Sequence, residues 1–264
     1  MSTNKRFFAF GCSFTNYIWP TWADLIGHNF GSNYFNYGRP GAGNVFIFNS
    51  IIEANQIHRF TKDDLIIIQW SSTDREDRYI NNKWVTPGCL INYQTDDYIK
   101  KYYSFKGFLI RDLATITSVV YMLKSIGCDY KFLTLNNLKK PVRSYFDGDD
   151  IDEMRDILVY YRDILELMPP SFNEILEFSD KLPLNIDDIL FEDIHPTPIE
   201  HYNYLHKVSP EYAVDCKELA NDYTQQLFEL IKKYYKHNWQ AELWNTRRHW
   251  PQLENNFMRI SQKL

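Results

Sequence analysis

The chain has 264 residues, of which 44% are hydrophobic, so it can form one large domain or one domain with an appendage. Its formal net charge of −5 at pH 7 gives no electrostatic support for binding to nucleic acid. No apolar stretch approaches the ~18 residues of a membrane-spanning helix, and the apolar run after Arg6 is too short for a signal peptide. The four cysteines are widely spaced and form no metal-ligand pattern. We therefore expect a cytoplasmic protein with free thiols, no metal or cofactor and no membrane contact.

Predicted strands and helices alternate along the first half of the chain. They are, in chain order, a strand at residues 6–10, a helix at 20–27, a short strand at 34–37, a helix at 44–56, a strand at 64–70, a helix at 108–126 and a strand at 130–135. The strands are continuous apolar runs that end in polar turns, which is typical of parallel strands buried on both faces. This pattern predicts a three-layer α/β/α fold with a parallel sheet, in which ligands bind at the carboxyl ends of the strands.

Other segments fall outside this alternation. Residues 74–104 are polar and aromatic and are expected to form an insertion after the third strand, and residues 145–180 a second insertion. Further helices are predicted at 149–167, 198–206 and 211–235. The predicted organisation is one domain over residues 1–205 and a helical C-terminal extension over 206–264. The tryptophan-rich end of this extension is expected to pack on the same domain or on another subunit of a homo-oligomer.

Candidate catalytic residues follow the predicted strands. The first strand runs into a Gly-x-Ser turn that presents Ser13, and the second into the glycine-rich stretch 36–44. Far downstream, Glu192 and Asp193 stand three and two positions before His195. A hydroxyl, an imidazole and a carboxylate are the groups that nucleophilic acyl transfer requires. The sequence thus offers each member of a catalytic triad, together with a loop that can approach a substrate closely.

In their order, these blocks resemble the SGNH (GDSL-like) hydrolases over about residues 5–205. The resemblance implies a flavodoxin-like parallel sheet and a serine esterase that removes an acyl group, such as acetyl, from a polar ester such as a carbohydrate. It implies that Ser13 is the nucleophile, although Cys12 stands where the family has an aspartate. Ser13 could instead cap the helix that follows. Cys12 is a weaker candidate nucleophile, because neighbouring residues in such a turn point in different directions.

The resemblance also implies an oxyanion hole. The last glycine of the family's second block donates its backbone N–H, which corresponds here to Gly41, with the backbone N–H of Ser13 as the second donor. Alternatively, the glycine-rich stretch only connects a strand to a helix. The family's third block supplies an asparagine after the third strand, and Thr73 stands nearest to that position. Because losing one such donor typically costs ~10²–10³ in turnover, this departure predicts a slow or specialised enzyme, a substitute donor such as the Thr73 hydroxyl or Arg75, or a lost activity.

Three residues near these loops are candidates for substrate binding. Arg39 and Arg75 could bind an anionic group of the substrate, and Asn44 could contact it or simply cap its own helix. The charged residues 76–78 are interpreted as a solvated, self-paired segment.

The fifth block of the family places an aspartate three residues before the catalytic histidine, where this chain has Glu192. Either Glu192 or Asp193 can orient the ring of His195. Asp193 is preferred, because its shorter side chain is held more rigidly. His201 is interpreted as structural or as part of the pocket rim.

Three functions stay open on the sequence alone. The first is an esterase, and an aromatic content of 17% fits stacking on sugar rings, although it can also reflect composition alone. The second is an acyltransferase that uses the same serine. The third is an inactive binding or structural protein that has lost its third-block donor.

Overall fold

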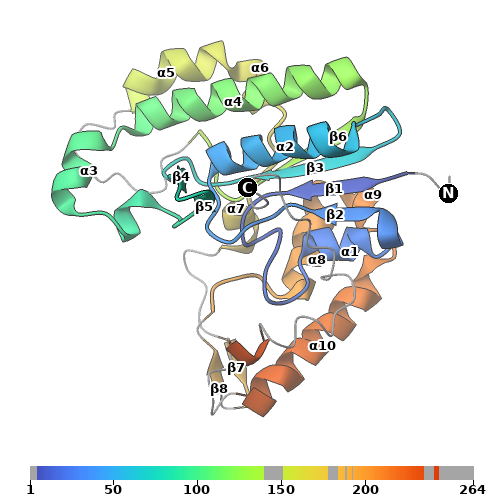
Figure 1. Cartoon of the computed structure of the whole chain (residues 1–264). Helices are drawn as coiled ribbons and strands as arrows, with labels where there is room; N and C mark the ends of the chain where they lie inside the picture. The colour runs from blue at the N-terminus through green and yellow to red at the C-terminus, as the bar shows by residue number, and fades with distance from the viewer. Residues whose placement is uncertain are drawn as a thin grey trace.

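A four-stranded parallel sheet forms the centre of the molecule (Figure 1). The computed structural model describes residues 5–139, 151–177, 184–187, 189–191, 193–234 and 241–243. The strands lie in the order β2 (Tyr34–Asn36), β1 (Phe7–Phe10), β3 (Leu65–Trp70) and β6 (Asp129–Thr134). All the residues of β1 and β3 are buried, as the continuous apolar runs require. The predicted α/β class with a parallel sheet is confirmed.

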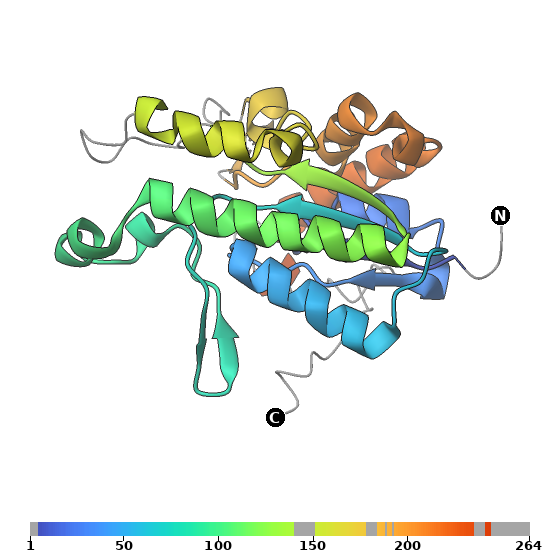
Figure 2. The ribbon, with the colours of Figure 1, turned by 90° about the horizontal axis from the view of Figure 1, so that it is seen from above.

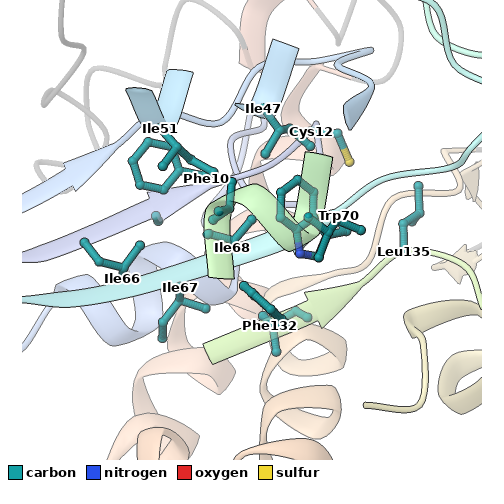
Figure 3. Packing of buried hydrophobic residues seen from close by; sticks show 14 of the residues in the cluster. Phe10, Cys12, Ile47, Ile51, Ile66, Ile67, Ile68, Trp70, Phe132 and Leu135 are labelled. Atoms are coloured by element: carbon teal, nitrogen blue, oxygen red, sulfur yellow. The ribbon is translucent and has the colours of Figure 1, made fainter. Parts of the chain in front are cut away.

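Helices cover both faces of this sheet. One face carries α2 (Asn44–His58) and α4 (Phe105–Ile126), which contact each other. The opposite face carries α1 (Trp22–Gly27), α8 (Pro198–Val208) and α9 (Pro210–Ala213), as Figure 1 shows. Figure 3 shows Phe10 of β1 close to Ile51 of α2, with Ile68 of β3 and Phe132 of β6 in the same hydrophobic cluster. This core holds the carboxyl ends of the strands in place, where the candidate residues lie.

Aromatic pairs connect β1 to β2. Phe7 stacks on Tyr34 with ring centroids 5.2 Å apart, and Phe8 stacks on Phe35 at 4.7 Å. These residues are also partners in the parallel register of the two strands. Side chains of successive strand residues point to opposite faces, so the two pairs support the register from both sides of the sheet.

Local signals explain where the helices begin and end. The Thr21 side chain accepts a hydrogen bond from the backbone N–H of Ala23 and forms a capping box with Asp24, so α1 begins at Trp22. Ser104 caps α4, which therefore begins three residues before the predicted start. Gly127 ends α4 in a left-handed conformation with φ of +78°.

The first insertion contains a short antiparallel hairpin of β4 (Arg78–Ile80) and β5 (Lys83–Val85). Figure 2 shows that this hairpin projects from the body of the molecule. It is followed by η2 (Leu90–Asn92) and α3 (Asp96–Tyr102), which leads into α4. The preceding residues, 75–77, lie at the base of the hairpin.

Two helices that were predicted to be continuous are each interrupted in the structure. The helix expected at 149–167 is α5 (Ile151–Tyr160) and α6 (Arg162–Leu165), interrupted at Tyr161, whose backbone leaves the helical region. The helix expected at 211–235 is interrupted as well, because Asp215 takes a left-handed φ of +62° between α9 and α10 (Cys216–Tyr234). Residues 140–150, including the start expected for the first of these helices, lie outside the described residues.

The remaining elements are short. They are η1 (Gly31–Asn33), α7 (Phe172–Leu176) and an antiparallel pair, β7 (Leu184–Ile186) and β8 (Ile189–Phe191), that the sequence analysis did not predict. Helix α10 of the C-terminal extension contacts α8 and α1. Beyond residue 234 only 241–243 are described, and Leu243 there is buried in a cluster with Leu25 of α1 and Leu227 of α10. The tryptophans of the predicted tail lie outside the described residues. Among the described helices, none combines the length and apolar character needed to cross a membrane.

Candidate active site

Ser13 lies in a tight turn directly after β1. The backbone N–H groups of Thr15 and Asn16 both donate to the carbonyl of Cys12, at 3.0 and 3.1 Å, and close this turn. A Cβ on Gly11 would lie 2.1 Å from the Thr15 hydroxyl, so only glycine fits at the start of the turn. The turn leaves the Ser13 side chain 6% exposed at the carboxyl end of the strand.

Ser13, His195 and Asp193 form a continuous hydrogen-bonded chain. His195 Nε2 lies 2.9 Å from Ser13 Oγ, and His195 Nδ1 lies 2.7 Å from Asp193 Oδ1. The same carboxylate oxygen accepts the backbone N–H of His195 at 2.9 Å. With the carboxylate on Nδ1, the tautomer protonated at Nδ1 leaves Nε2 free to accept the serine proton. The short sequence separation of Asp193 and His195 therefore suffices to orient the imidazole.

The sequence analysis missed Tyr17. Its ring stacks on the ring of His195 with centroids 3.8 Å apart and an interplanar angle of 17°. Its hydroxyl donates to Asp193 Oδ2 at 2.7 Å, so one side chain contacts both the acid and the imidazole. The only sequence signal is the position of Tyr17 four residues after the serine, among Phe14 and Trp19, whose rings also lie near His195.

The electrostatic environment keeps this acid charged. Burial alone would raise the pKa of Asp193, but the hydrogen bonds and attraction from His195 and the hydrogen bond from Tyr17 outweigh it and hold the pKa below its ordinary value. Burial and the neighbouring Asp193 charge raise the pKa of Tyr17 well above its ordinary value. Tyr17 thus remains a neutral donor and Asp193 an ionised acceptor across the physiological pH range.

Gly41 lies in a loop that rests against the Ser13 turn. The backbone N–H of Arg39 donates to the carbonyl of Gly11 at 3.0 Å, and Asn16 Nδ2 donates to the carbonyl of Gly38 at 2.8 Å. Gly41 has a left-handed φ of +76°, and a Cβ there would lie only 2.0 Å from the carbonyl oxygen of Thr86. Glycine is therefore required at this position by both conformation and space.

The residues after β3 reach the same edge of the sheet. Thr73 is 3% exposed, and its Oγ1 has no hydrogen-bond partner among the described residues. Its backbone carbonyl accepts Arg111 Nη2 at 3.2 Å. An unpaired buried hydroxyl is uncommon in folded proteins. Asn136, which follows β6, donates to the hydroxyl of Ser72 and was also missed by the sequence analysis.

The predicted substrate-binding residues contact the protein itself. Arg39 Nη2 donates to the carbonyl of Trp84 at 2.7 Å, and Arg75 Nη1 to the carbonyl of Ala42 at 2.9 Å. Asn44 is 1% exposed and uses both donors of its amide, one on the Ser71 carbonyl and one on an Asp112 carboxylate. These contacts correct the interpretation of Asn44, which joins α2 to β3 and α4 rather than facing a substrate.

The remaining candidates are Glu192, His201 and Cys12. Glu192 lies outside the described residues, and the carboxylate on His195 is that of Asp193. His201 is 1% exposed in α8, packed edge-on against Phe172. Cys12 is fully buried in the core, which argues against a role as the nucleophile. No group of three or more His, Cys, Asp or Glu residues in the described part of the chain could hold a metal ion.

Comparison with known proteins gives a distant structural similarity. No protein-family model matches the chain, and no curated protein matches it. A solved structure, that of a member of the lipolytic protein G-D-S-L family from Veillonella parvula DSM 2008, is similar with a TM-score of 0.41 and 16% sequence identity. The match covers 78% of this chain and 98% of the other.

Proposed function

We propose that the protein is a serine hydrolase that removes a short acyl group, such as acetyl, from a polar ester. The observation that carries this proposal is the chain of contacts from Ser13 Oγ through the His195 ring to Asp193, at 2.9 and 2.7 Å. Ser13 meets two residues from a distant part of the sequence, His195 and Asp193, in the order that nucleophilic acyl transfer requires. The low pKa of Asp193 supports its role as the charged orienting acid.

The proposed reaction has two halves. His195 Nε2 takes the proton of Ser13 as the Ser13 oxygen attacks the ester carbonyl, and the protonated ring then gives this proton to the departing alcohol. Water gives a proton to His195 and attacks the resulting acyl-serine; the bond between the acyl carbon and Ser13 Oγ then breaks, His195 returns the proton to Ser13 Oγ, and the acid is released. Asp193 stabilises the imidazolium in both halves. An acyltransferase would differ only in the second half, where another hydroxyl would replace water.

The negative oxygen of each tetrahedral intermediate needs donors. We assign this role to the backbone N–H groups of Ser13 and Gly41 and to the hydroxyl of Thr73. The unpaired state of Thr73 Oγ1 among the described residues supports this assignment, because a buried hydroxyl without a partner gains a hydrogen bond when an oxyanion arrives.

A fluorophosphonate serine-hydrolase probe tests this proposal without knowledge of the substrate. We expect the probe to label the wild type and not Ser13→Ala. Ser118→Ala, which removes an exposed hydroxyl on α4, is the matched control and should be labelled like the wild type. If neither the wild type nor the control is labelled, and neither hydrolyses acetyl esters, a binding or structural protein would be the better explanation.

A further inference from the structure

The loop that carries Gly41 is held from outside by the insertion after β3. Asp77 Oδ1 accepts the backbone N–H of Gly43, and Asp77 Oδ2 accepts that of Phe46, both at 2.8 Å. Gly43 is the N-cap residue of α2 and has no side chain to satisfy the first N–H groups of the helix. A carboxylate 31 to 34 positions away in the sequence therefore caps this helix.

Further contacts come from both sides of the hairpin base. Arg75 Nη1 donates to the carbonyl of Ala42 at 2.9 Å, and Thr86 Oγ1 donates to the carbonyl of Pro40 at 2.9 Å. Arg39 Nη2 returns a bond to the carbonyl of Trp84 at 2.7 Å. These residues of the insertion thus bond to the loop at nearly every position between residues 39 and 43.

The fit is close as well as hydrogen-bonded. A Cβ on Gly41 would lie 2.0 Å from the Thr86 carbonyl oxygen, and a Cβ on Gly43 would lie 2.8 Å from Cβ of Arg75. On its other side the loop bonds to the Ser13 turn through Arg39 and Gly38. The loop is therefore confined between the turn that carries the nucleophile and the base of the insertion.

We infer that the base of the β4–β5 hairpin is a clamp that positions the oxyanion loop, with Asp77 as its principal positioning residue. We call this set the hairpin clamp, defined by Arg75, Asp77, Trp84 and Thr86. It deepens the proposed function and rests on it, since the clamp matters for catalysis only if Gly41 donates to an oxyanion. The sequence pattern alone predicts a solvated charge at Asp77. Its neighbours Glu76 and Arg78 do pair with each other, but Asp77 turns inward to the loop.

The hairpin clamp explains how the backbone N–H of Gly41 can be held in place although its loop is rich in glycine. Donors that stabilise a transition state must be in place before the reaction, because reorganisation during it would raise the barrier. A loop that contains both Gly41 and Gly43 is intrinsically flexible, so external hydrogen bonds are needed to fix it. The hairpin itself projects from the body (Figure 2), while its base supplies these bonds.

Asp77→Asn tests the clamp, since it replaces one of the two acceptors by a donor. We expect kcat on a small acetyl ester to fall at least tenfold, but by less than the ~10²–10³-fold loss that follows complete removal of an oxyanion donor. KM should change less than about twofold, because the contacts made by the bound substrate are retained. Thr86→Val, which removes one exposed hydroxyl bond, should show the same kcat effect more weakly. Glu76→Gln, the neighbouring acid-to-amide change, should leave kcat unchanged.

Hydrogen exchange provides a readout that does not depend on activity. The amides of Gly43 and Phe46 should exchange faster in Asp77→Asn than in the wild type or Glu76→Gln. Unchanged exchange would overturn the clamp, and faster exchange with unchanged kcat would overturn its role in catalysis. A wild type that neither reacts with the probe nor hydrolyses esters would overturn the proposed function, with the exchange result still deciding whether the loop is clamped.

Discussion

Removing the hydroxyl of Tyr17 should measure how much this residue stabilises the charged carboxylate of Asp193. Tyr17→Phe keeps the ring that stacks on His195 and removes only the donor 2.7 Å from Asp193 Oδ2. The acceptor is a carboxylate whose side chain is 5% exposed. A hydrogen bond to a charged group contributes about 1.5–3 kcal/mol, so we expect the free energy of unfolding to fall by about that amount at neutral pH.

The pH dependence of this loss identifies its source. The folded pKa of Asp193 lies below the ordinary value of 3.8, so the stability that its charge contributes is present above that value and is lost as pH falls through the folded pKa. Tyr17→Phe raises the folded pKa of Asp193. The difference between the two proteins should therefore shrink as pH falls below 3.8, where the carboxylate becomes protonated.

Urea unfolding at several pH values is the assay. Tyr121→Phe, which removes the hydroxyl of a side chain 68% exposed on α4, is the matched control and should change stability little. In an Asp193→Asn background, Tyr17→Phe should cost much less than in the wild type, because the charged acceptor is gone. A loss below about 0.5 kcal/mol, or one that is constant with pH, would refute the reasoning, since the charged hydrogen bond would then not be its source.

Two further predictions concern Gly41 and Thr73 of the proposed oxyanion hole. Gly41→Ala and Gly127→Ala both place a side chain at a left-handed φ, +76° and +78°, but only Gly41 faces an atom, the Thr86 oxygen at 2.0 Å. In thermal unfolding, Gly127→Ala should lower the free energy of unfolding by about 1–2 kcal/mol, and Gly41→Ala should lower it by more. Equal losses would contradict the close fit of Gly41 against Thr86. If the Thr73 hydroxyl donates to the oxyanion, Thr73→Val should lower turnover on acetyl esters ~10²–10³-fold. Thr73→Asn should retain or raise turnover. Turnover unaffected by Thr73→Val would mean that Thr73 is not part of the oxyanion hole.

The two central strands of the sheet were predictable because each is a continuous apolar run. Residues 64–70 contain Leu65–Trp70, and residues 6–10 contain Phe7–Phe10, so the apolar runs and their polar ends located both strands within one residue. The interruption at Tyr161 and the left-handed turn at Asp215 were not predictable in this way, because neither is marked by glycine or proline. The helical patterns on either side of them therefore predict a continuous helix.

The site was predictable where the interacting residues are close in sequence, and where the order of the sequence blocks placed Ser13 and His195 together. Asp193 and His195 are two residues apart, and their contact follows from that spacing. Tyr17 and Asp77 act through contacts that depend on the tertiary fold, 176 and 31 to 34 positions away. A tyrosine after a turn and an aspartate in a charged run have no local pattern that distinguishes them from ordinary surface residues.

The aromatic pairs between β1 and β2 determine how accurately the residues of the candidate site are placed relative to one another. Ser13 lies three residues beyond the end of β1 and Gly41 five residues beyond the end of β2. The distance between the proposed nucleophile and the proposed oxyanion donor therefore depends on the alignment of these strands. A slip of one residue would shift the donor by about 3.3 Å and turn each ring of Phe7 and Phe8 to the wrong face. Enlarging or trimming Phe8 or Phe35, at a distance from the triad, should therefore change the turnover of the proposed reaction before it changes the fold.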